Sequence, residues 1–157
     1  MELKPGIGID NIVFGMSQFE IESILGRSDE QRDYQNDDFK YLCVFNKQKI
    51  HLSFYMLHKN KFGFLDTTND KLTYNNLPII NSNIDFALNE IFIDLVTEWE
   101  LKEFDTFTEY FSKEYWLNLH VEYGVITNVE MGVPFKNEDE FEWPELAKEN
   151  AILKYWP

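Results

Sequence analysis

The side chains best suited to proton transfer are the histidines, of which the chain has three. His120 lies two residues before Glu122 in a segment of alternating apolar and polar residues, so one face of a strand is expected to present both. Such a pair could serve as acid and base in a small hydrolase. The sequence contains no His-Glu-x-x-His helix motif, no glycine-rich phosphate loop and no nucleophile elbow. A single strand histidine is more often a surface residue, and we therefore predict that the protein is not an enzyme.

The one cysteine, Cys43, lies on the apolar side of another alternating segment. A single cysteine cannot form an internal disulfide, and a buried cysteine behaves as a small apolar side chain. No spacing of Cys, His, Asp and Glu matches a metal site. We expect Cys43 in the core and predict neither a metal nor a cofactor.

Aromatic residues make up 17% of the chain, and Tyr and Trp are enriched where proteins bind proteins. Four side chains are predicted to lie opposite the apolar stripe of their strands: Tyr55, Trp116, His120 and Glu122. Two interpretations stay open for the two aromatic residues among them. They could form a protein-binding face, or they could pack across neighbouring strands or beneath residues 155–157.

The chain carries 28 acidic and 14 basic residues, which gives a formal net charge of −14. The basic residues form no run, and this argues against nucleic-acid binding, because phosphate contacts need clustered Lys and Arg. The acidity has two open explanations, solubility or electrostatic steering of a basic protein partner. The densest acidic cluster includes Glu138, Asp139 and Glu140, which we add to the predicted binding face. Farther along, Pro144 and Glu145 suit the first turn of a short C-terminal helix.

These candidate residues lie in a chain whose sequence repeats internally, and a repeat constrains the architecture. Residues 12–17, Ile-Val-Phe-Gly-Met-Ser, return at residues 84–89 as Ile-Asp-Phe-Ala-Leu-Asn. Apolar residues follow each copy at helical spacing, which predicts a short amphipathic helix in each repeat. Ser17 and Glu20 match a capping box for the first helix, and Asn89 occupies the equivalent capping position of the second.

The first helix is expected to end at Gly26, whereas the second has no such stop and is expected to continue toward Trp99. Beyond each helix, apolar and polar residues alternate, and this pattern predicts strands. The predicted strands are residues 39–45, 50–56, 62–65, 117–123 and 125–133. Each repeat is thus expected to hold one helix and about four antiparallel strands.

Together the patterns predict an α+β fold. Two helix-plus-strand repeats are expected to share one antiparallel sheet, with the helices on one face and a short helix at the C-terminus. Residues 1–157 are predicted to form a single domain. The repeats span about residues 7–68 and 79–133, the polar residues 67–78 connect them, and residues 134–157 form a C-terminal segment.

The first repeat opens with Ile12-Val13-Phe14-Gly15-Met16-Ser17, followed by Glu20-Ile21 and then by Ile24-Leu25-Gly26. This pattern resembles the opening of a superfamily that includes the β-lactamase inhibitor protein and the small outer-membrane assembly lipoproteins. The resemblance implies a tandem-repeat fold whose sheets form a continuous surface that grips another protein. The second repeat departs from the pattern, because Ala87-Leu88-Asn89 replaces the glycine, the methionine and the hydroxyl residue. The resemblance implies no site residue for this chain.

Residues 1–5 lack the basic start and apolar run of a secretion signal, and no stretch is as long as a membrane span. We therefore expect a cytoplasmic protein with no membrane partner. The acidity and the aromatic content predict a non-catalytic, protein-binding inhibitor. Its most concrete form is a bacterial immunity-type protein that blocks a basic toxin or enzyme by steric and electrostatic occlusion. The alternatives are a small hydrolase using His120 and Glu122, and a domain that forms a homodimer through its exposed sheet face.

Overall fold

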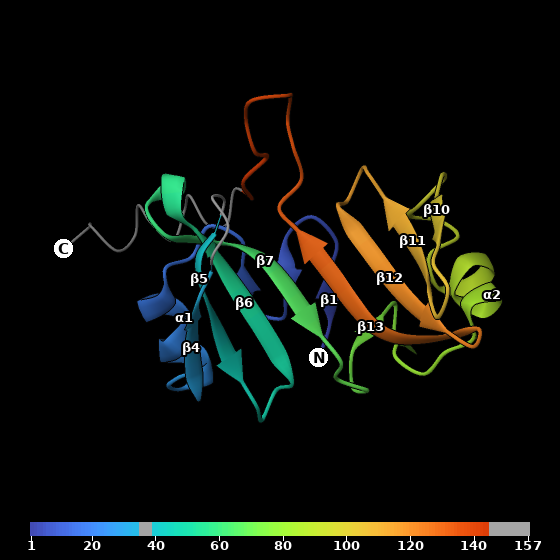
Figure 1. The fold of residues 1–157 in the computed structure, drawn as a ribbon, viewed down its shortest axis with the longest axis horizontal. Helices are drawn as coiled ribbons and strands as arrows, with labels where there is room; N and C mark the ends of the chain where they lie inside the picture. Colours follow the sequence, from blue (N-terminus) through green and yellow to red (C-terminus); the bar gives the residue numbers. More distant parts are fainter. Residues whose placement is uncertain (35–38, 145–157) are drawn as a thin grey trace.

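The computed structural model describes residues 1–34 and 39–144. Strands account for 43% of the described residues and helices for 14%. The predicted α+β class, with helices covering one face, is therefore wrong. The described part of the chain is mainly β, built around one eight-stranded sheet and two short α-helices (Figure 1). The predicted C-terminal helix falls outside the described residues.

The large sheet is antiparallel throughout. Its spatial order is β10 (Glu100–Glu103), β11 (Thr108–Ser112), β12 (Leu117–Glu122), β13 (Val125–Gly132), β7 (Lys61–Thr67), β6 (Ile50–Tyr55), β5 (Phe39–Phe45) and β4 (Glu30–Asp33). Strands β4 to β7 form one half as successive neighbours, and β10 to β13 form the other. The halves meet where β13 pairs with β7 in the middle of the sheet (Figure 1).

The remaining elements are short. A small sheet holds β1 (Leu3–Lys4), β2 (Gly8–Ile9) and β3 (Ile12–Val13), and a further pair joins β8 (Thr73–Tyr74) to β9 (Leu77–Pro78). The helical segments are α1 (Gln18–Leu25), the 3-10 turn η1 (Met56–His58), α2 (Ile84–Phe86) and the π-helical turn η2 (Ala87–Ile91). One helical segment thus precedes each half of the large sheet.

The first helix begins and ends where the sequence predicts. Ser17 Oγ accepts a hydrogen bond from the Glu20 backbone N–H at 3.2 Å, and its hydroxyl donates to Glu20 Oε1 at 3.1 Å. Gly26 follows the last helical residue with φ of +87°, a conformation that glycine adopts without a steric penalty. The predicted cap and terminator of α1 are confirmed.

The second helical segment differs from its prediction. Asn83, not Asn89, is the N-cap, and its Oδ1 accepts from the Asp85 backbone N–H at 2.8 Å. The segment ends at Ile91 rather than continuing toward Trp99, because the backbone leaves the helical conformation at Phe92, with φ of −107° and ψ of 9°. Phe92 and Val96 are buried, but they reach the core from turn and coil. The apolar residues after position 91 therefore do not form a further helical face.

The core lies against one face of the large sheet. The strands contribute fully buried side chains to it, among them Leu52, Leu65, Leu119, Val129 and Met131. The N-terminal strands, the turn after β3 and the helical segments complete it with Ile9, Phe14, Ile21, Ile84 and Ile91. Burial of a large apolar side chain stabilises a fold by roughly 1.5–3 kcal/mol. This face is therefore occupied by the core, and the opposite face is the one that a partner can reach.

We call the face opposite the core the open face. Its side chains alternate along the strands with buried ones and are partly exposed: His51, Asp66, Asn118, His120 and Glu130. Such alternation is typical of an antiparallel sheet with one face in the core and the other toward solvent. In the described ranges, no helix is long and apolar enough to cross a membrane.

Candidate functional site

A row of side chains crosses the open face at one level of the sheet. The strand register places Phe111 opposite Asn118, Asn118 opposite Glu130, and Glu130 opposite Asp66, which in turn faces His51. Directly opposed residues in antiparallel strands have Cβ atoms about 5 Å apart. The hairpins thus bring residues from both halves of the chain into one continuous row.

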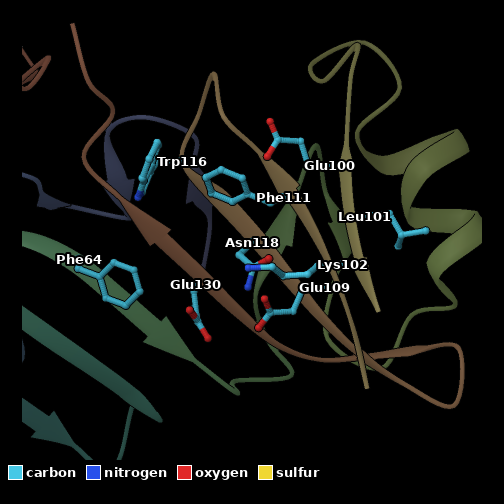
Figure 2. A pocket seen from close by; sticks show the side chains of 9 residues that line it. All are labelled: Phe64, Glu100, Leu101, Lys102, Glu109, Phe111, Trp116, Asn118 and Glu130. Atoms are coloured by element: carbon cyan, nitrogen blue, oxygen red, sulfur yellow. The ribbon is translucent and has the colours of Figure 1, made fainter. Parts of the chain in front are cut away.

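A pocket of about 330 Å³ opens over one end of this row (Figure 2). Its lining combines aromatic rings, carboxylates and one cation: Phe64, Glu100, Leu101, Lys102, Glu109, Phe111, Trp116, Asn118 and Glu130. We call it the Glu130 pocket. Strands β7, β10, β11, β12 and β13 all contribute to it, so the sheet as a whole fixes its shape.

Trp116 forms one wall of the pocket and owes its position to backbone geometry. It is the last residue of the turn between β11 and β12, with φ of +50°, and its ring meets the Phe111 ring edge-on at 5.0 Å. Gly132 lies beneath the indole. A Cβ atom at Gly132 would fall 2.6 Å from Trp116 Cδ1, so this close approach requires glycine on the neighbouring strand.

Three carboxylates line the pocket against one cation, Lys102, which lies opposite Glu109 on the paired strands β10 and β11. Burial, together with the negative charges of Asp66 and Glu109, raises the pKa of Glu130 to about 7. Asp66 accepts one hydrogen bond from Asn128 Nδ2 at 3.2 Å. Like charges directly opposite each other on paired strands are destabilising. The site therefore favours either a proton or a cation supplied by a ligand.

Asn118 adds an unused acceptor. Its Oδ1 atom is shielded from solvent and has no hydrogen-bond partner among the described residues. An unsatisfied buried acceptor costs free energy that a suitable donor would restore. Asn118 lies between Phe111 and Glu130 in the row and lines the pocket, although its Oδ1 atom faces away from solvent.

Tyr55 lies away from the Glu130 pocket. Its ring stacks on Phe39 at 4.3 Å and contacts Phe141 at 4.8 Å. A Cβ atom at Gly63 would fall 2.1 Å from its Cε2, so the ring packs directly over that glycine. Tyr55 therefore packs between strands and against Phe141, whereas the suggested cover by residues 155–157 falls outside the described residues.

His120 and Glu122 lie farther along β12, toward its C-terminal end. His120 Nδ1 is 3.9 Å from Glu109 Oε1, and His120 Nε2 is 3.9 Å from Glu122 Oε1. These distances exceed hydrogen-bonding range. The imidazole also stacks on the Phe107 ring at 4.5 Å. His120 thus lies between the carboxylates of Glu109 and Glu122. Of these two side chains, Glu122 is the more exposed.

Glu138, Asp139 and Glu140 lie at the tip of a turn that projects past the end of β13 (Figure 1). Asn137 Oδ1 accepts from the backbone N–H groups of Asp139 and Glu140, both at 3.0 Å, and leaves their side chains exposed. Phe135, at the base of this turn, packs edge-on against Trp116 at 4.9 Å. The acidic turn therefore adjoins the tryptophan end of the pocket.

Sequence reasoning thus found only Trp116 among the pocket residues and missed its acidic floor. Asn118 and Glu130 alternate with buried residues in predicted strands, but the period-two pattern does not mark either residue as special. Glu109 and Phe111 lie on β11, which the sequence analysis did not predict as a strand. Neighbours across strands depend on register, and register was not available from the sequence alone.

No protein-family model and no curated protein matches this chain. Two solved structures are similar in fold. One is an extracellular protein containing an SCP domain from Bacillus anthracis, with a TM-score of 0.53 and 8% identity, covering 84% of this chain and 49% of that one. The other is a DUF4309 family protein from Bacillus subtilis, with a TM-score of 0.51 and 10% identity, covering 81% and 87%. The chain thus spans about half of the first structure, and at these identities the similarity shows the fold alone.

Proposed function

We propose that this protein is a non-catalytic inhibitor that binds a basic protein through its open face. The observation that carries the proposal is the excess of carboxylates over cations around Glu130, framed by the half-buried rings of Phe111 and Trp116. Protein-binding surfaces combine exposed aromatic side chains with charge complementary to the partner. The net charge of −14 would steer a basic partner toward this surface.

The mechanism proposed is occlusion without chemistry. An eight-stranded sheet presents a broad, rigid face, and docking of a partner over it would cover the partner's own active surface. A bacterial immunity-type role, in which the chain neutralises a toxin, is the most concrete form of this proposal. The resemblance of residues 14–17 to the superfamily of the β-lactamase inhibitor protein supports the same mode of binding.

Affinity capture tests this proposal. The tagged protein is incubated with its native lysate and washed across a salt series, and the retained proteins are identified by mass spectrometry. We expect one basic protein that is released at moderate salt, because exposed charges are screened within about 10 Å at 0.1 M salt. Retention of no protein, with the product of the neighbouring gene also supplied, would contradict the proposal.

A further inference from the structure

The Glu130 pocket has the size and the lining of a site for one side chain. At about 330 Å³ it lies near the small end of ligand pockets, which run from roughly 300 to 1,000 Å³. Three carboxylates line it, from Glu100, Glu109 and Glu130, against the single cation of Lys102. The Lys102 ammonium lies 6.0 Å from the centre of the Phe104 ring, and the ion pairs within 4.0 Å in the described ranges do not include it.

We infer that the Glu130 pocket binds an arginine side chain presented by the partner protein. This inference rests on the proposed function and adds the chemical group that anchors the partner. Glu109 and Glu130 lie on strands either side of β12 and would accept from the guanidinium, and Asn118 on β12 lines the pocket beside them. The guanidinium carries five N–H donors in a planar fork, which suits several acceptors in one site.

The aromatic wall favours arginine over lysine. A guanidinium is planar, stacks on aromatic faces and is less strongly hydrated than an ammonium group. Phe111 and Trp116 stand edge to face at 5.0 Å and, with Phe64, bound the pocket beside its carboxylates. A lysine would neutralise the same charge but would leave part of the acceptor set unused. The site is therefore expected to discriminate between the two cations.

Binding of a cation is expected to be coupled to the proton on Glu130. Two groups face Glu130 from the adjacent strands, Asp66 on β7 and Asn118 on β12, and Glu109 lies one strand farther, on β11. Lys102 on β10 and His120 on β12 lie beside these groups. Two of these are carboxylates that disfavour ionisation of Glu130. A bound guanidinium would offset their effect and lower the pKa of Glu130. Binding should therefore weaken as the pH falls below neutrality.

The test is an NMR titration of the full chain at pH 8 with N-acetyl-arginine amide, and then with N-acetyl-lysine amide at the same ionic strength. The readouts are the side-chain amide of Asn118 and the indole N–H of Trp116. We expect saturable shifts at both, with the arginine compound binding roughly fivefold more tightly. Glu130→Gln should weaken arginine binding roughly tenfold. Glu90→Gln removes the same charge from an exposed position on η2, outside the pocket, and should leave arginine binding unchanged.

A second readout separates a built site from diffuse attraction to an acidic surface. Carboxyl-carbon NMR of Glu130 should report a lower pKa when the arginine compound is bound. Shifts that do not saturate, or that are equal in Glu130→Gln and in the parent protein, would overturn the inference. If the arginine compound fails to bind while a basic protein is still retained through the open face, this inference fails and the proposed function stands. If the arginine compound binds saturably but no protein partner is retained, the pocket binds arginine as inferred and the proposed function fails.

Discussion

Glu130 and Asp66 lie directly opposite each other on β13 and β7, the two strands through which the halves of the sheet meet. Two carboxylates in this relationship repel each other, and partial burial adds the cost of removing charge from water. The pKa of Glu130, raised to about 7, expresses both effects. Because this pair of carboxylates destabilises the fold, it is expected to serve binding rather than stability. Binding of a cation on the open face would be such a role.

The first prediction concerns stability and pH. In the unfolded chain Glu130 has a pKa near 4.5, whereas in the folded chain the pKa is about 7, so the folded state holds more protons between these values. Stability therefore falls as the pH rises from about 4.5 to 7. Glu130→Gln is expected to raise the free energy of unfolding at pH 8 by on the order of 2 kcal/mol, and most of this gain should disappear at pH 5. Urea denaturation at both pH values measures it.

Glu122→Gln is the matched control for that experiment, because Glu122 lies on the same face with a more exposed side chain. It should change the free energy of unfolding little at either pH. A Glu130→Gln variant that is destabilised equally at pH 5 and pH 8 would show that the carboxylate makes a structural contact instead.

The second prediction concerns the wall of the pocket. Gly132→Ala places a methyl group 2.6 Å from Trp116 Cδ1 and should destabilise the fold by about 1–3 kcal/mol. Because the clash is with the indole, Trp116→Ala should remove most of this penalty in the double variant. A double-mutant cycle measured by thermal or urea unfolding gives the coupling energy. Additive effects of the two substitutions would contradict the packing described for Trp116.

The third prediction concerns Cys43. The side chain is fully buried, and burial raises the pKa of its thiol to about 11. Since the thiolate is the reactive form, a disulfide reagent at pH 8 should label Cys43 only as fast as the protein unfolds. Labelling should become rapid in denaturing urea. Rapid labelling of the folded protein would place the thiol at the surface instead.

The fourth prediction tests the start of the second helical segment. Asn83→Ala removes the side chain that caps Asp85 and should cost about 1 kcal/mol of stability. Asn89→Ala is the control, since Asn89 is exposed within η2 and holds no cap there. It should change stability by a few tenths of a kcal/mol. A larger loss for Asn89→Ala than for Asn83→Ala would restore the helix start that the sequence pattern suggested.

The predicted strands were confirmed where one face is buried, because alternation of apolar and polar residues then marks them. Strands β5, β6, β7, β12 and β13 all fall within or close to predicted segments. The edge strands β4 and β10 were missed because all four residues of each are exposed, so neither has a buried stripe to reveal it. The fold class was wrong because these strands and β11 were not predicted, and because residues 92–99, which are turn and coil, were assigned to a helix.

The candidate site, too, could be predicted only in part from the sequence. Trp116 could be identified from its residue type and its place beside an alternating segment. The pairing of Glu130 with Asp66, and their proximity to Glu109, depends on which strands are neighbours and in what register. Strand β13 pairs with β7 although more than fifty residues separate them in the sequence, and local sequence patterns do not predict such a pairing.

The most direct test of the central claim is a comparison of three baits in the capture experiment. The first is the parent protein, and the second carries Glu109→Gln, Glu122→Gln and Glu130→Gln on the open face. The third carries Asp85→Asn, Glu90→Gln and Asp94→Asn, three exposed acids on and beside the second helical segment, and has the same net charge as the second. We predict that a basic protein is retained by the first and third baits and lost from the second. Equal retention by the second and third baits would contradict binding through the open face.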